Sequence, residues 1–141
     1  MRRLLTIFAL LSWSAAATAQ VAVIAHKSVP ADTLSKTRLL DCYTGDAKKW
    51  AGGQDITVFD LKPKGKVRKA FYRFLGKRSS RMKSIWLKNM LSGEGSPPEA
   101  VESEEALVEK VAATPGSIGF VRKALVDQEV KVLIVIDGEE D

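Results

Sequence analysis

The sequence predicts an α/β fold in which helices flank a mixed or mainly parallel sheet. Two observations lead to this prediction: short apolar, β-branched runs recur along the chain, and segments with helical periodicity separate them. Such runs are typical of buried strands, and strands that alternate with helices are typical of layered α/β domains. The predicted strands cover residues 21–25, 56–59, 118–121 and 131–137.

The first predicted helix covers about residues 36–43. Ser35 is a favourable N-cap, because its hydroxyl can accept a hydrogen bond from a backbone N–H of the first turn, and Gly45 suits the helix end. Cys42 falls within the apolar pattern of this helix. We expect a buried structural thiol rather than a reactive one, because Cys42 is the only cysteine and a redox site normally has a second thiol nearby.

Two helices are predicted to follow one another in the middle of the chain. Apolar residues of the first recur at i, i+3, i+4, i+7 and i+8, and the helix ends at Gly76; its inward stripe is Val67, Ala70, Phe71, Phe74 and Leu75. Ser79 or Ser80 can cap the second. We expect the inward face of that helix to hold Met82, Ile85, Trp86 and Met90.

The last predicted helix begins after Ser103, which can cap it. Glu104 and Glu105 in its first turn complement the helix dipole. A turn over residues 114–117 leads into the third strand, and we expect residues 139–141 to form a solvated tail.

The first nineteen residues have the pattern of a secretory signal peptide. Arg2 and Arg3 form a positive n-region, residues 4–13 form an apolar stretch too short for an ordinary membrane span, and Ala17-Thr-Ala19 is a small-residue cleavage site. We expect cleavage after Ala19, with an uncleaved anchor as the alternative. The mature chain, residues 20–141, would then form one domain in the periplasm of a Gram-negative cell.

Charge is unevenly distributed along the sequence. Residues 61–93 hold eleven Lys/Arg and no Asp/Glu, whereas residues 94–141 hold twelve acids and four bases. This polarity favours an anionic ligand or surface for the middle segment. We expect no nucleic-acid partner, because the chain carries an export signal and lacks a recognised nucleic-acid motif.

The sequence lacks the patterns that would indicate catalysis. His26 is the only histidine and has no partners at metal-ligand spacing. Neither a G-x-S-x-G elbow nor a Walker-type phosphate loop is present. We therefore expect no enzymatic activity, no catalytic residue, no metal and no cofactor.

The best functional clue is the segment from Asp60 to Phe71, where a strand ends, a basic loop follows and a helix begins. That order directs the free N–H groups and the partial positive charge of a helix N-terminus toward the space in front of it. Gly65 would let the backbone approach an anion, and the added charges are Lys62, Lys64, Lys66 and Arg68. A solvated lysine-rich surface is the alternative, because cations at a helix N-terminus are mildly unfavourable.

Several segments resemble the phosphate-type periplasmic solute-binding proteins of ABC transporters. Leu-Leu-Asp-Cys-Tyr-Thr-Gly at 39–45 followed by Trp50 resembles their helix-plus-tryptophan segment, and Thr-Pro-Gly-Ser-Ile-Gly-Phe-Val at 114–121 resembles their closing Pro-Gly-x-Ile-Gly-Tyr-Val segment. Residues 130–138 resemble their final strand. Gly65 to Arg68, with Phe71, occupies the place of their Ser-Gly-Thr-Arg-x-x-Phe anion loop, whose hydroxyl residues are absent here. The predicted ligand-binding residues are Lys64, Gly65, Lys66, Val67 and Arg68.

The resemblance implies a single lobe of the type 2 periplasmic-binding fold, because the chain is about half the family's usual length. It also implies an exported protein that binds a small oxyanion, phosphate first, with an ABC transporter membrane component or another periplasmic protein as a partner. We expect Arg68→Glu to abolish binding while leaving the fold intact. The rival interpretation is an interaction module that has lost the ligand, whose basic face binds an acidic protein, an anionic membrane surface or a second copy.

Overall fold

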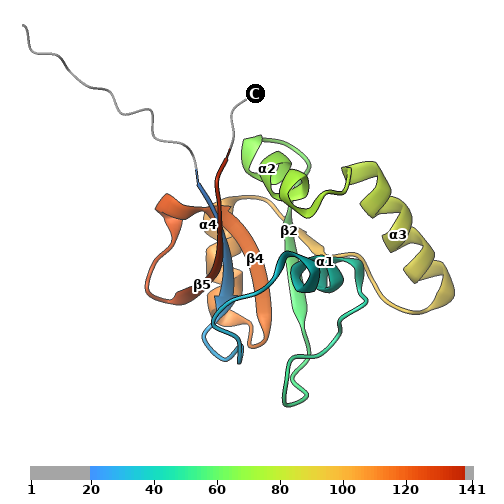
Figure 1. Ribbon diagram of the computed structural model, residues 1–141, viewed down its shortest axis with the longest axis horizontal. Helices are drawn as coiled ribbons and strands as arrows, with labels where there is room; N and C mark the ends of the chain where they lie inside the picture. The colour runs from blue at the N-terminus through green and yellow to red at the C-terminus, as the bar shows by residue number, and fades with distance from the viewer. Residues whose placement is uncertain (1–19, 139–141) are drawn as a thin grey trace, which may run out of the picture.

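The computed structural model in Figure 1 describes residues 20–138 and shows a sheet with helices on both faces. Predictions for residues 1–19 and 139–141, including the signal peptide and the acidic tail, lie outside the described residues. The elements are, in chain order, β1 (Val21–His26), α1 (Lys36–Thr44), β2 (Thr57–Leu61), α2 (Lys66–Leu75), α3 (Ser79–Ser92), β3 (Glu99–Val101), α4 (Glu104–Ala113), β4 (Ser117–Arg122), the 3₁₀ turn η1 (Lys123–Leu125) and β5 (Val130–Ile136).

The sheet is mixed and its strands follow the order β3-β2-β4-β1-β5. β2 runs parallel to both β3 and β4, whereas β1 runs antiparallel to β4 and β5. The predicted α/β class with a mixed sheet flanked by helices is therefore confirmed. The short edge strand β3 was not predicted, because its three residues, Glu-Ala-Val, carry no apolar run.

Two neighbouring residues of β4 show how the two faces of the sheet are covered. Successive residues of a strand point to opposite faces. A Cβ at Gly119 would clash with Leu107 of α4, so this face lies directly against α4. Phe120 points the other way and stacks on Phe71 of α2 at 3.9 Å between ring centroids, with Tyr43 of α1 packed edge-on against Phe71. The core therefore lies in two layers, one on each side of β4.

Gly116 fixes the turn that precedes β4. Its φ of +78° is a conformation that side chains disfavour, and a Cβ there would clash with the backbone oxygen of Asp55. Its carbonyl oxygen accepts a hydrogen bond of 2.9 Å from the Trp50 indole N–H. Both glycines of the Pro-Gly-Ser-Ile-Gly segment thus serve close packing of the fold.

Helix α1 confirms its predicted N-cap. The backbone N–H of Arg38 donates to the Ser35 hydroxyl at 3.1 Å, and Gly45 ends the helix in the left-handed conformation. Cys42 is buried, as expected, and burial raises the pKa of its thiol to about 11. A buried, protonated thiol is a poor nucleophile, so the structural role predicted for this cysteine agrees with its surroundings.

Helix α3 departs from the prediction at two points. Its N-cap is Arg78, without a side-chain cap, so neither predicted serine serves in that role. Met90 was expected to face inward but is half exposed, because the helix packs mainly through Met82 and Trp86. The Trp86 indole N–H donates to the Tyr43 carbonyl oxygen at 2.8 Å, which attaches α3 to α1 at the edge of the molecule (Figure 1). None of the helices described is long and apolar enough to cross a membrane.

Candidate functional site

The predicted anion loop connects the carboxyl end of β2 to the first turn of α2. One of its lysines is bound elsewhere: the Lys62 backbone N–H donates to the Val101 carbonyl oxygen at 3.1 Å, and its ammonium group pairs with Glu102. That pairing lowers the pKa of Glu102. Lys62 therefore holds the loop against the end of β3. The positive charge near the start of α2 comes from the residues that follow Lys62 in the chain.

The N-terminus of α2 has the features of an anion site. Gly65 is the N-cap, has a φ of +94°, and provides no side chain to accept from the first N–H groups. The first turn contains no acidic residue that would offset the partial positive charge of the helix end. Lys64 and Lys66 flank this position and are exposed. The arrangement leaves backbone donors and two ammonium groups available to a ligand.

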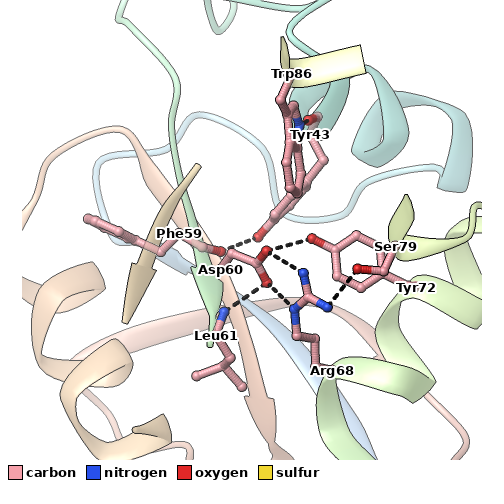
Figure 2. A network of polar contacts seen from close by, with 8 residues as sticks. All are labelled: Tyr43, Phe59, Asp60, Leu61, Arg68, Tyr72, Ser79 and Trp86. Atoms are coloured by element: carbon pink, nitrogen blue, oxygen red, sulfur yellow. Dashed lines mark hydrogen bonds and ion pairs between the residues drawn. The ribbon is translucent and has the colours of Figure 1, made fainter. Parts of the chain in front are cut away.

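Arg68 differs from these lysines because its guanidinium group is held inside the protein. It forms a two-pronged pair with Asp60, with Nε and Nη2 each 3.2 Å from a carboxylate oxygen, and its Nη1 donates to the Ser79 hydroxyl at 3.0 Å (Figure 2). It also lies over the Tyr72 ring, at 4.5 Å from the centroid. The residue is only 8% exposed.

The Asp60 carboxylate is the centre of this network (Figure 2). It accepts 2.7 Å and 2.8 Å hydrogen bonds from the Tyr72 hydroxyl and the Leu61 backbone N–H, besides those from Arg68. Burial, and then the nearby Asp60 charge, raise the pKa of Tyr72 above its usual value, so this phenol remains a donor. Within residues 20–138, no buried side-chain polar atom lacks a partner. The network is complete without a ligand.

This geometry corrects one expectation from the sequence. Arg68→Glu was expected to leave the fold intact, but it would place a second carboxylate beside buried Asp60 and remove that residue's countercharge. Breaking a buried pair in this way is strongly destabilising. Loss of binding in that variant would not identify a ligand contact, so the exposed lysines are the appropriate test positions.

A cavity of about 580 Å³ opens beside α2. Of the five predicted ligand-binding residues it brings together Lys64, Gly65 and Arg68, whereas Lys66 and Val67 are not among its lining residues. Lys66 is exposed at the first position of the helix, and Val67 packs against the core. The remaining lining residues were not predicted as site residues: Pro63, Lys69, Tyr72, Arg73, Gly76, Lys77, Arg78 and Ser79.

Two patterns in the sequence could have revealed the buried network. Arg68 and Tyr72 are spaced i, i+4, so they share one face of α2. Asp60 is an acid at the end of an otherwise apolar strand, directly before a segment without other acids. The part played by Ser79 had no comparable indication, because a serine at a helix start is ordinarily assigned to capping.

The described residues offer no alternative centre for metal chemistry: between residues 20 and 138, no group of three or more His, Cys, Asp or Glu is placed to hold an ion. His26 ends β1, and its Nδ1 lies 2.7 Å from the Ser28 hydroxyl oxygen. The Ser28 hydroxyl oxygen accepts a hydrogen bond of 3.1 Å from the Gly116 backbone N–H. These contacts connect the end of β1 to the turn before β4.

Similar structures indicate the fold family of this lobe. One similar structure is a protein from Clostridium perfringens, assigned as a phosphate ABC transporter substrate-binding protein and solved with bound phosphate. The TM-score is 0.68 and the sequence identity 20%, and the match covers 82% of this chain and 45% of the other. An ABC-type phosphate transport receptor from Vibrio cholerae has a TM-score of 0.66 and 21% identity, over 82% and 46% of the two chains. PstS from Borrelia burgdorferi has a TM-score of 0.59 and 14% identity, over 82% and 47%.

These similarities confirm the predicted resemblance of the fold to one lobe of phosphate-type substrate-binding proteins. The chain spans less than half the length of each of these structures. No protein-family model matches the sequence, and no curated protein matches it either. At 14–21% identity the likeness concerns the fold alone.

Proposed function

We propose that this protein is exported to the periplasm and binds a small oxyanion, phosphate first, at the N-terminus of α2. Gly65 lets the backbone approach the ligand. The backbone N–H groups of the first turn, residues 66–68, donate to it. The ammonium groups of Lys64 and Lys66 supply positive charge. Arg68 acts as a positioning residue: its pair with Asp60 holds the first turn of the helix against the end of β2.

One observation carries this proposal. The first turn of α2 has cations and neither a capping side chain nor an acid, which is an unfavourable arrangement for an isolated helix end. A bound oxyanion would accept hydrogen bonds from the free backbone N–H groups. It would also offset the repulsion between the lysine ammonium groups and the partial positive charge of the helix end. The similarity of the lobe to a structure solved with bound phosphate supports the same ligand.

The exposure of the site sets the expected strength of binding. Lys64, Gly65 and Lys66 are all exposed, so counterions and water compete with the ligand. We expect a dissociation constant between about 1 µM and 1 mM, or roughly −8 to −4 kcal/mol. An ABC transporter membrane component, or another periplasmic protein, is the partner that such a function would require.

Titration calorimetry with phosphate and then sulfate, at fixed ionic strength, tests the proposal. Lys64→Gln and Lys66→Gln should each weaken phosphate binding. Lys27→Gln is the matched control. Lys27 follows β1, and β1 runs opposite to β2, so Lys27 lies at the other end of the strands from the start of α2. Saturable, phosphate-selective heat that only the first two variants reduce supports the site; heat that all three variants reduce equally contradicts it.

A second function is favoured by the outer face of α3. Three large apolar side chains there are 49–81% exposed, and exposed cations accompany them without an acid on the helix: Leu87, Met90 and Leu91, with Arg81, Lys83 and Lys88. A protruding apolar and basic helix is suited to binding an acidic protein partner or an anionic surface. Under this alternative, added phosphate raises the thermal stability of the protein no more than another salt at the same ionic strength, and the effect does not saturate.

A further inference from the structure

We propose that the outer face of α3 docks on an anionic lipid bilayer, with its exposed apolar side chains at the boundary of headgroups and acyl chains and its cations against the lipid phosphates. This inference rests on the second function proposed above, whose partner it names, and it is independent of the oxyanion site at α2. It follows from a second apolar face on the helix, from the position of that face and from its unpaired charge.

Helix α3 is apolar on two faces. Met82 and Trp86 form the inner face, which is buried against the protein. The outer face holds three apolar side chains at i, i+3 and i+4: Leu87, Met90 and Leu91, which are 54%, 49% and 81% exposed. One apolar stripe is sufficient to pack a surface helix on its own domain. The second stripe therefore indicates a contact with something outside the domain.

Within residues 20–138, no second element encloses the outer face of α3. Figure 1 shows the helix at the margin of the molecule, to one side of the sheet. The hollow of about 480 Å³ on this side is lined by residues of α3 alone: Ser84, Leu87, Lys88, Leu91 and Ser92. A small molecule or a partner helix would be held by a groove with walls from more than one element. A helix that projects its side chains outward is suited to a flat surface, and a bilayer is such a surface.

The charge of α3 complements an anionic surface. Arg81, Lys83 and Lys88 are exposed, and none of the three forms an ion pair with another residue between 20 and 138. Residues 61–93 contain no acid that would offset them. Each cation close to an anionic bilayer strengthens binding by about fivefold, so the three together contribute on the order of a hundredfold. Lys83 lies one turn before Leu87, which places charge and apolar surface on the same face.

A second copy of the chain is a poorer match for this face. Packing α3 against α3 of another copy about a two-fold axis would bring the same cations together. The acidic half of the sequence is partly neutralised within its own copy, because Glu99, Glu102 and Glu104 already pair with cations there. Anionic lipid headgroups supply the opposite charge without such competition.

Cosedimentation of the purified protein with vesicles tests the inference. Vesicles of phosphatidylglycerol and phosphatidylcholine in equal parts should bind it at least about tenfold more tightly than vesicles of phosphatidylcholine alone, and added salt should weaken the binding. An environment-sensitive dye on Leu91→Cys should shift its emission to the blue when the anionic vesicles are added, because that position enters the headgroup boundary. Native Cys42 is buried, so the dye attaches to the introduced cysteine.

One pair of variants tests the apolar contact. Leu87→Gln together with Leu91→Gln should weaken vesicle binding at least about tenfold, although the net charge stays the same. Val135→Thr is the matched control, because Val135 is 44% exposed and lies on β5 rather than on α3. It should leave vesicle binding unchanged.

A second pair tests the charge. Lys83→Gln together with Lys88→Gln should weaken vesicle binding by about 25-fold. Lys64→Gln together with Lys66→Gln removes the same number of exposed cations from the start of α2, and should change vesicle binding by less than about twofold. Circular dichroism and urea unfolding of every variant should match those of the parent protein, because all of the substituted positions are exposed.

The outcomes separate this inference from the oxyanion site. Absence of binding to the anionic vesicles, or equal binding to phosphatidylcholine alone, overturns the inference and leaves the oxyanion site to its own calorimetric test. Vesicle binding that survives the leucine substitutions, or that the α2 substitutions weaken equally, also overturns it, because diffuse charge would then explain the binding. Dimers detected by light scattering and abolished by the leucine substitutions would assign the face to a second copy instead of a bilayer. Failure of phosphate to bind overturns the first proposed function and leaves lipid docking standing.

Discussion

Replacing Asp60 by alanine should destabilise the protein strongly. The substitution leaves the Arg68 guanidinium without its countercharge, and it removes the acceptor of the Tyr72 hydroxyl and of the Leu61 N–H. Removal of one partner from a buried ion pair costs about 3–5 kcal/mol. Such a loss is a large fraction of the roughly 5–15 kcal/mol by which domains are stable.

Urea unfolding, followed by the fluorescence of Trp50 and Trp86, measures the effect. With a urea slope of about 1.5 kcal/mol per M, the midpoint should fall by roughly 2–3 M. Asp32→Ala is the matched control: that carboxylate is fully exposed, lies 3.6 Å from the Lys131 ammonium, and should lose nothing measurable. An Asp60→Ala midpoint equal to that of Asp32→Ala would refute the buried pair.

A double-mutant cycle sharpens this test. Asp60→Leu and Arg68→Met each leave one buried charge unpaired, whereas the double variant leaves none. The double variant should therefore be less destabilised than the sum of the two single variants. Additive losses would show that the two side chains do not interact in the way described.

Three further predictions concern other parts of the fold. Gly116→Ala should destabilise the protein more than Gly52→Ala in the same urea assay, because both have positive φ but only Gly116 faces a backbone oxygen at that position. Native Cys42 should react with iodoacetamide at pH 8 at least about 100-fold more slowly than the unfolded chain, because burial raises the pKa of its thiol from 9.0 to about 11. The same shift should lower the free energy of unfolding as the pH rises from about 9 to 11, because the thiol ionises first in the unfolded chain. The carboxyl of Glu102, followed by NMR, should titrate below its ordinary pKa, and Lys62→Met should reverse that shift.

The fold class could be predicted from the sequence because it depends on local patterns. Buried runs such as Val21–Ala25 and the helical spacing of Phe71 and Leu75 are present in the chain itself and correspond to buried residues in the structure. The antiparallel placement of β1 and β5 could not be predicted, since strand order and direction depend on pairings between distant residues such as Val21 and Arg122.

The candidate site could be predicted only in part. The loop and helix start around Gly65 follow from local sequence, and the structure places Lys64, Gly65 and Arg68 along one cavity. The engagement of Arg68 by Asp60 was not foreseen. It requires the end of β2, the first turn of α2 and the start of α3 to meet, a tertiary arrangement that the charge pattern of the segment does not reveal.

Backbone ¹⁵N NMR during phosphate titration tests the central claim most directly, because it observes the donors themselves. The claim predicts saturable shifts at the amides of Gly65, Lys66 and Val67, with little change at Lys27, which lies at the opposite end of the strands. Sulfate at equal ionic strength should produce smaller shifts. Shifts that never saturate, or that spread over exposed lysines generally and track ionic strength, would contradict an oxyanion site at the start of α2.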